Sequence, residues 1–557
     1  MAWSITETAK DVGRLYELAS IFIRYGFGDV VEELGLKQAL KQAGKALKWK
    51  EVEDFAELTA AQRARQAMEE MGPTFIKLGQ ILATRVDMFT PDWIAEFEKL
   101  QSHVPTVDFE ELRPQLEEDL GAPPEEVFAE METTPIGSAS MAQTYRARLA
   151  DGSRVILKIR RPGIRPMMES DLRLLSRLAE IAEEQLPNAH LYRPRALVHQ
   201  FASALRSELN LATECRNAER AVANLPDDSV LVIPKVCWQW TCERLNVQEL
   251  IEGIPGHDVK KLDSANLDRA YLARQGAATI SRMVLEDGFF HADPHPGNIF
   301  YLSGNRLALI DWGMVGRMPQ ASRDRLIDLL HGLVEKNIEG VVDILLQWSG
   351  NDDVDRERLS ADVEEYIHQY YDVSLNTLDM AVLFSDLTLM LRENSLSLPP
   401  DLAMMIKVFI TLEGLGRQLD PAFNLMAEAQ PILRKALLQR YSPGSVSKRV
   451  RQIMSESLVL FTGLPKDVQQ VIKALRNGTL KHRIEISQLE EFGRQVDNAA
   501  NRLAISFITA AFIIGTSVIV ASDNGPTLFG VPFFEIFGYC AMLGGLWLLI
   551  SIWWKKR

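Results

Sequence analysis

Cysteine is scarce in this chain, and this scarcity argues against two classes of protein. The four cysteines are spread over 557 residues, and the spacing of the nearest pair, Cys237 and Cys242, matches no common zinc motif. Neither a disulfide scaffold nor a cysteine zinc site is expected, and the thiols are predicted to be reduced and buried. The net charge of −14 at pH 7 also argues against general nucleic-acid binding.

The first 27 residues lack the features of a targeting segment. They contain no apolar stretch followed by a small-residue cleavage site, and they carry acidic residues, which transit peptides avoid. We therefore expect an amphipathic helix here and no export of the chain. Because 557 residues are too many for one hydrophobic core, several domains are expected.

Charge is missing from two stretches near the C-terminal end. Residues 503–521 and 536–554 each run for 19 residues without a charged side chain, enough to cross the roughly 30 Å hydrocarbon core of a bilayer. Lysine and arginine flank the pair on both outer sides but are missing from the link, which places both flanks in the cytoplasm. The pattern predicts two transmembrane helices, with a buried hairpin of a soluble domain as the alternative.

Helical and strand-like patterns divide the chain into five predicted parts. A helical extension comes first, then a small sheet with a helical insertion, a mostly helical lobe, a basic segment and the apolar stretches. The predicted boundaries are 1–125, 126–253, 254–460, 461–502 and 503–554. The basic segment fits either a helix on anionic lipid or an ordinary solvated helix. One β-hairpin is predicted at Asp151-Gly152, and another joins 298–302 to 306–310. The order indicates an α+β protein.

The stretch HADPHPGNIF at 291–300 gathers most of the chemically active side chains. Asp293 lies five residues before Asn298, and Asp311 follows thirteen residues later, beyond the second hairpin. Protein kinases have this arrangement of an Asp-x4-Asn catalytic loop, a hairpin and an Asp-Phe-Gly turn. Phosphoryl transfer needs one carboxylate to orient the nucleophile, and an amide and a second carboxylate to hold Mg²⁺. The spacing predicts Asp293 as the catalytic carboxylate, and Asn298 and Asp311 as metal ligands.

The histidines of this stretch suggest a second interpretation, a transition-metal site. A His-x3-His site needs both rings on one face of a helix, and Pro294 and Pro296 disfavour a regular helix there. We therefore expect His291 and His295 to brace the loop by hydrogen bonds, with His291 in the place of the kinase loop histidine.

A lysine and a glutamate upstream fit the rest of a nucleotide site. Lys158 lies on the second strand of the first predicted hairpin, where kinases carry a phosphate-binding lysine. A lone strand lysine is commonly a solvated edge residue, but here it precedes the catalytic motifs in the right order. Glu214 is the predicted helical partner of Lys158, and Glu208 lies on the same stretch.

Glycine is nearly absent from the loop where a kinase would have Gly-x-Gly-x-x-Gly. Gly137 is the one glycine of residues 135–143, and mostly small side chains surround it. Small residues allow backbone N–H groups to approach phosphates, but each Cβ narrows the allowed backbone, so nucleotide preference or position should differ. A hinge for adenine is predicted at 247–253. The predicted ATP-binding residues are Ile136, Gly137, Ser138, Ala139, Ser140, Met141, Ala142, Gln143, Thr144, Lys158, Glu249 and Ile251.

An Ala-Pro-Glu motif is missing after the Asp-Trp-Gly turn at 311–313. The chain runs directly into a helical pattern instead. The peptide-docking platform of a protein kinase is therefore predicted to be absent, which argues against phosphorylation of other proteins.

Together these motifs resemble the UbiB family, also called the AarF or ADCK family, of atypical protein-kinase-like proteins. The resemblance covers residues 60–320 by motif, and the apolar hairpin also fits bacterial members. KLGQ at 77–80 matches the family's Lys-x-Gly-Gln, an alanine-rich loop replaces the glycine-rich loop, and 291–298 matches His-x-Asp-x-His-Pro-Gly-Asn. One motif departs from the family, because its Glu-x-Asp is Glu208-Leu209-Asn210 here. No role is assigned to the lost second acid.

The resemblance implies a protein-kinase-like two-lobe fold between an N-terminal helical extension and a C-terminal transmembrane helical hairpin. It implies that Lys77, Gln80 and Glu208 belong to a regulatory extension that closes the nucleotide site. It also implies ATP and Mg²⁺ binding, ATPase activity, and support of ubiquinone biosynthesis at a bacterial inner membrane, with the catalytic domain on the cytoplasmic side. The implied partners are the lipid bilayer, polyprenyl quinone intermediates and other ubiquinone-biosynthesis enzymes.

Three functions stay open at this point. The first is a membrane-anchored ATPase or small-molecule kinase, the second a true protein kinase acting in trans, and the third a pseudokinase scaffold. The intact residues Lys158, Asp293, Asn298 and Asp311 weigh against the scaffold. A homodimer through the transmembrane helices, the phosphoacceptor and the quinone also stay open.

Overall fold

The structure is a computed structural model that describes most of the chain up to residue 440. The described residues are 9–35, 58–100, 106–185, 193–227, 229–349, 354–371 and 379–440, with 507, 510, 514, 527–528 and 531–532. Residues 1–448 form one unit and residues 449–557 another, and all the site residues below lie in the first.

A five-stranded antiparallel sheet forms the first lobe. Its strands are β1 (Phe128–Met131), β2 (Gly137–Ser138), β3 (Ala142–Leu149), β4 (Arg154–Arg160) and β6 (Leu245–Glu249), in the order β1-β3-β4-β6 with β2 on β3. Tyr145 and Leu157 pair on one face and are buried against helix α7 (Phe109–Leu120). Because side chains alternate along a strand, Thr144 and Lys158 pair on the opposite face. The predicted turn at Asp151-Gly152 joins β3 to β4.

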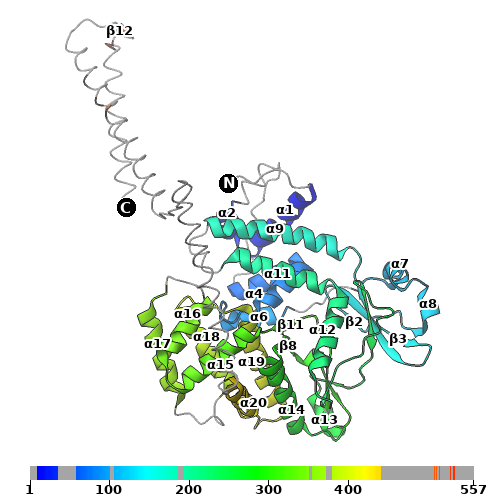
Figure 1. The fold of residues 1–557 in the computed structure, drawn as a ribbon. Helices are drawn as coiled ribbons and strands as arrows, with labels where there is room; N and C mark the ends of the chain where they lie inside the picture. Colours follow the sequence, from blue (N-terminus) through cyan, green and yellow to red (C-terminus); the bar gives the residue numbers. More distant parts are fainter. Residues whose placement is uncertain are drawn as a thin grey trace, which may run out of the picture. The chain divides into compact units, whose positions relative to one another are not determined.

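Helices from two separate parts of the sequence pack together beside this sheet. The extension contributes α1 (Ala9–Arg24), α2 (Gly28–Glu33), α4 (Ala60–Met71), α5 (Pro73–Leu82) and α6 (Pro91–Glu98), whereas its α8 (Pro124–Val127) contacts β1 and α7. The insertion contributes α9 (Ile164–Gln185), α11 (Pro194–Glu208) and α12 (Leu211–Asn224). Figure 1 shows α9 and α11 side by side. Leu18, Leu172 and Phe201, one from each of α1, α9 and α11, share an apolar cluster, so extension and insertion have a common core.

Short strands and helical turns build the second lobe. One sheet has the order β5-β10-β9-β7, and a second pairs β8 with β11. The strands are β5 (Leu231–Val232), β7 (Ile254–Pro255), β8 (Phe289–His291), β9 (Ile299–Leu302), β10 (Arg306–Leu309) and β11 (Val315–Arg317). Between them lie α13 (Val259–Ser264), α14 (Arg269–Arg282), the π-helical η1 (Met283–Asp287) and the 3₁₀ turn η2 (Pro296–Asn298). The predicted hairpin at 298–310 is β9–β10.

Strand β5 departs from the sequence-based division. It lies within 126–253, which the sequence assigns to the first lobe, yet it pairs in parallel with β10 of the second lobe. A strand of two residues carries too little pattern to indicate its partner.

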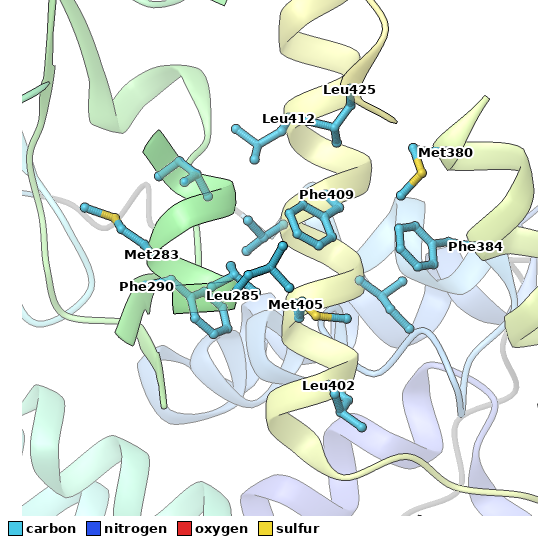
Figure 2. Packing of buried hydrophobic residues seen from close by; sticks show 14 of the residues in the cluster. Met283, Leu285, Phe290, Met380, Phe384, Leu402, Met405, Phe409, Leu412 and Leu425 are labelled. Atoms are coloured by element: carbon cyan, nitrogen blue, oxygen red, sulfur yellow. The ribbon is translucent and has the colours of Figure 1, made fainter. Parts of the chain in front are cut away.

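Helices after β11 complete the second lobe. They are α15 (Gln320–Val334), α16 (Ile338–Ser349), α17 (Arg356–Tyr371), α18 (Met380–Glu393), α19 (Pro400–Leu419) and α20 (Leu425–Arg440). Figure 2 shows α19 in the middle of the largest apolar cluster, with Phe290 on one side and Phe384 on the other. The ring of Phe409 stacks on Phe384, with centroids 6.2 Å apart. The late helices and the β8 region therefore share one core.

The C-terminal predictions fall largely outside the described residues. These are the basic segment at 461–502 and the two predicted spans at 503–521 and 536–554. In the part of the chain that the structure describes, no helix is both long and apolar enough to cross a bilayer. Two short strands, β12 (Thr527–Leu528) and β13 (Val531–Pro532), pair with each other in the second unit.

Candidate nucleotide site

Lys158, Glu214 and Asp311 meet at one point between the two lobes. The Nζ atom of Lys158 lies 2.8 Å from Oε2 of Glu214 and 3.3 Å from Oδ2 of Asp311. Strand β4 carries the lysine, the first turn of α12 carries Glu214, and Asp311 follows β10. The structure thus brings together three residues that the sequence predicts for one site, from positions 158 to 311.

Burial and mutual charge shift the pKa of each member of this cluster. Burial raises the pKa of Glu214 to about 7, with Lys158 opposing the rise and Asp311 adding to it. Burial would also raise the pKa of Asp311, but the charges of Lys158 and Lys77 hold it well below its usual range. The two carboxylates raise the pKa of Lys158 against the effect of burial. Lys158 and Asp311 are therefore charged at neutral pH, whereas Glu214 titrates near neutrality.

The histidines brace the catalytic loop, as the sequence predicts. His291 is completely buried, and its Nδ1 accepts the N–H of Asp293 at 3.2 Å. The proton must then lie on Nε2, which donates to the carbonyl of Ile310 at 3.2 Å. Burial lowers the pKa of His291, which keeps the ring neutral. Nδ1 of His295 accepts the N–H of Gly297 at 3.0 Å.

The predicted metal ligands present oxygen atoms suited to Mg²⁺. The Asn298 amide nitrogen donates to the Asp293 carbonyl at 3.2 Å, which leaves the amide oxygen for a metal. The Oδ1 atom of Asp311 accepts the N–H of Gly313 at 3.2 Å, which orients its carboxylate. Mg²⁺ binds through one or two protein oxygens and completes its shell with phosphate and water, so this donor set fits it.

The turn that carries Asp311 is held in an uncommon backbone conformation. Asp311 has a φ of 58°, in the left-handed region that residues with a side chain rarely adopt. The amide of Asn217 donates to the Trp312 carbonyl at 3.0 Å and accepts from Arg317 at 3.2 Å. Because Asn217 lies three residues after Glu214, one face of α12 holds both the lysine partner and the turn at 311–313, called the metal turn below after its predicted ligand Asp311. Sequence reasoning missed Asn217, although its helical spacing from Glu214 was visible.

The loop that replaces the glycine-rich loop folds onto an arginine. Arg161 donates from Nε to the Ala139 carbonyl at 3.0 Å and from Nη2 to the Ser138 hydroxyl at 2.7 Å. Ser140, Met141, Ala142 and Gln143 are buried, whereas Ile136 is 44% exposed. Sequence reasoning missed Arg161, although the paired arginines at 160–161, where the Lys158 strand ends, were a visible signal.

A cavity of about 630 Å³ lies beside the hinge. Strands β1 and β3, residues 250–253 and Phe300 of β9 line it, and Ile251 is part of this wall. Glu249 turns elsewhere, since its carboxylate accepts the N–H of Lys235 at 3.3 Å. The volume is in the range of small-molecule sites.

The extension contacts the site through Lys77. Lys77 forms an ion pair with Glu208 at the end of α11 and lies near enough to lower the pKa of Asp311. Gln80, by contrast, donates to the Leu100 carbonyl at 2.9 Å, inside the extension itself. The Oδ1 atom of Asn210, where the family has an aspartate, is buried without a hydrogen-bond partner among the described residues.

Family models match three segments of the chain. They are the ABC1 atypical kinase-like domain at residues 99–345, the UbiB helical domain at 363–424 and the ABC1/UbiB kinase-like C-terminal domain at 487–554. The first model covers the first lobe and the second lobe as far as α16, and it includes the Lys158 cluster and residues 291–300. The second begins within α17 and contains all of α18 and α19.

Curated relatives match nearly the whole chain. It is 32% identical over 526 residues to "Probable protein kinase UbiB" of Xanthomonas campestris, covering 92% of this chain and 93% of the relative. It is 28% identical to the protein of the same name in Xylella fastidiosa, covering 98% and 100%. Among solved structures, the Mycobacterium tuberculosis structure titled as the complex of Rv3197 with erythromycin aligns at a TM-score of 0.42. The two sequences are 22% identical, and the alignment covers 75% of this chain and 99% of that chain.

Proposed function

Because the chain belongs to the ABC1/UbiB family of atypical kinase-like proteins, we propose that it hydrolyses ATP or transfers its γ-phosphate to a small acceptor. The site would lie between the lobes, and the activity would support ubiquinone biosynthesis at a bacterial inner membrane. The cluster of Lys158, Glu214 and Asp311 is the observation that carries this proposal.

Each residue of the site has a role that its geometry supports. Lys158 would hold the α- and β-phosphates, with Glu214 fixing the direction of its ammonium group. Asn298 and Asp311 would hold Mg²⁺, which neutralises phosphate charge when bound. Asp293 would accept the proton of the attacking hydroxyl or water, from a loop that His291 keeps in shape.

The acceptor side of the site suits a small molecule better than a peptide. A cavity of about 340 Å³ lies next to the metal turn, lined by residues of α5, α11, α12 and the start of α19. Gly313 and Met314 form part of its wall. Helices of the extension and insertion thus wall this side of the Asp-Trp-Gly turn, which favours an ATPase or small-molecule kinase over a protein kinase in trans.

Membrane association is part of the proposal and rests on the sequence. The two 19-residue stretches without charge would anchor the chain, and the basic flanks would keep the catalytic unit on the cytoplasmic side. An anchored site would have access to polyprenyl quinone intermediates in the bilayer or to the enzymes that act on them.

Phosphate release from Mg·ATP in the presence of liposomes tests this function. We expect Asp311→Asn to lower kcat by at least about 100-fold, since it removes a charged metal ligand while keeping the shape of the side chain. Equal activity in wild type and Asp311→Asn would contradict the proposal. Stoichiometric phosphorylation of an added biosynthetic enzyme would favour a protein kinase instead.

A further inference from the structure

Lys407 of helix α19 stands next to the proposed catalytic carboxylate. Its Nζ atom lies 3.9 Å from Oδ1 of Asp293 and 3.9 Å from Oε1 of Glu98 on α6. The lysine side chain is 14% exposed, on a helix whose neighbouring residues Met405, Ile406, Val408 and Phe409 form part of the apolar core. An ammonium group is costly at such a position unless it has a charged partner or a ligand.

The two carboxylates alone do not explain why a lysine stands here. Asp293 and Glu98 are 38% and 50% exposed, and both contacts are at the outer limit of an ion pair. Pairs of this kind contribute little to stability. In contrast, a proposed role in the reaction does explain it. Asp293 would accept the proton of the attacking group, so an ammonium group about 4 Å from it would lie near the phosphoryl group that is transferred.

The catalytic loop carries no permanent positive charge of its own. Between Asp293 and Asn298 the side chains are Pro294, His295, Pro296 and Gly297. Among the described residues, the cations within 4 Å of the Asp293 carboxylate are Lys407 and, when protonated, His295. Lys158 and Lys77 are paired with Glu214 and Glu208.

Helix α19 follows the site along one face. Pro400 and Met404 line the cavity beside the metal turn, and Lys407 comes three residues later on the same side of the helix. Further along, Leu412 and Leu415 share an apolar cavity with Pro294 of the catalytic loop. The buried helix therefore sets the position of Lys407 relative to Asp293.

We infer that Lys407 binds the γ-phosphate of ATP and stabilises the charge on the phosphoryl group during transfer, so that α19 completes the catalytic site. The inference rests on the proposed function. In the reaction the bond from the γ-phosphorus to the β-γ bridging oxygen breaks, a bond from phosphorus to the acceptor oxygen forms, and the acceptor proton passes to Asp293. Lys407 acts as a point charge and takes no part in bonding.

The test compares binding of ATP and ADP, both with Mg²⁺, and steady-state turnover in the full-length protein. We expect Lys407→Met to weaken ATP binding about tenfold, leave ADP binding within about twofold, and lower kcat about 100-fold, as for loss of one transition-state contact. Lys407→Arg should restore most of both properties, since it keeps the charge. Lys435→Met is the control. It removes a lysine of α20 that is 58% exposed and pairs with Glu286 of η1, and it should behave like wild type.

The outcomes separate this inference from the proposed function. Wild-type-like ATP selectivity and kcat in Lys407→Met, together with an inactive Asp311→Asn, would overturn the inference and leave the function standing. Equal losses of ATP and ADP binding in Lys407→Met would contradict a contact with the γ-phosphate, because ADP lacks that group, and would indicate a structural role for Lys407. If Lys407→Met selectively loses ATP binding while the wild type releases no phosphate, the contact with the γ-phosphate is supported and the proposed function is contradicted. Lys407→Gln serves the same comparison if thermal melts show that the Met variant is unfolded.

Discussion

Glu214 is the residue whose charge state governs how Lys158 is held. Its pKa of about 7, raised chiefly by burial, places its titration within the physiological range. When Glu214 is ionised, the ammonium group of Lys158 is shared between two carboxylates, and when Glu214 is neutral, Asp311 alone attracts it. The ionised form is the one that would leave Asp311 available for the proposed Mg²⁺.

A pH profile of kcat/KM for ATP tests this view. Because kcat/KM reports the free enzyme, we expect it to fall about tenfold per pH unit below pH 7 as Glu214 gains a proton, and to level off above it. Glu214→Gln should have lower activity and lack this limb of the profile. ATP itself also titrates in this range, so the comparison between the two proteins carries the result, and identical profiles would contradict it.

At the level of single residues, motif spacing pointed to the candidate site residues but not to the groups that hold them in place. Asp293, Asn298 and Asp311 follow a fixed spacing imposed by one loop and one hairpin, so the sequence pointed to them. The bracing role of His291 followed from the prolines that exclude a helix. Arg161 and Lys407 escaped prediction, because their importance depends on which distant backbone or carboxylate they meet.

Helices of the extension and the insertion are joined by a buried carboxylate. Asp171 of α9 is completely buried and accepts from Nε and Nη2 of Arg14 at 2.8 and 3.1 Å. It also accepts the hydroxyl of Thr74 at 2.6 Å, at the start of the α5 helix that carries Lys77. One side chain therefore fixes α1, α5 and α9 relative to each other.

Removing this carboxylate should loosen all three helices together. We expect Asp171→Ala to lower the free energy of unfolding by about 3–5 kcal/mol, because Arg14 is left without its buried partner. Glu180→Ala is the matched control on α9, where the half-exposed pair with Arg177 should contribute less than about 1 kcal/mol. Urea denaturation measures both free energies of unfolding. Similar losses of stability in the two variants would contradict the role of Asp171 in joining the three helices.

Among the elements, the sequence predicted those whose partners lie nearby in the chain. Both hairpins were found because their turn residues and alternating strands are local signals. The pairing of β5 with β10 was missed, since two residues show no period and the partner lies about 75 residues away. The mutual packing of α1 and α9 is likewise a property of the folded chain.

The extension is also fastened to the late helices on the other side of the molecule. Asp87 is 2% exposed and accepts from Arg85 at 2.7 Å and from the N–H of Leu398, just before α19, at 2.9 Å. Arg392 of α18 donates to the Val86 carbonyl at 2.8 Å. The extension is thus bound both to the insertion and to the late helices, among them α19, which carries Lys407.

Breaking this second attachment should affect regions far apart in sequence. We expect Asp87→Ala to cost about 3–5 kcal/mol of unfolding free energy, since it leaves Arg85 buried without its partner. Hydrogen exchange should then increase in α5, α6 and the start of α19 together. Glu70→Ala, which removes a partly exposed partner of Arg24, should leave exchange in α19 unchanged. Faster exchange confined to residues 85–90 would contradict the coupling.

For the molecule as a whole, the sequence indicated a kinase-like protein and the order of its parts. It did so because the kinase-like motifs keep a few residues at fixed spacings along the chain. It did not show that α19, which lies beyond the motifs, stands next to Asp293. That placement depends on the shared core around Phe409, whose apolar residues give no indication of which surface they will cover.

The parallel pairing of β5 with β10 also determines how the two lobes can move. The chain leaves the first lobe after α12, pairs with the second at β5, returns to form β6 and crosses again to β7. Three segments of the chain therefore connect the two lobes, whereas a single hinge would be one such segment. Three connections should resist wide opening of the lobes, so a nucleotide bound between them, as proposed, would enter and leave through a narrow passage.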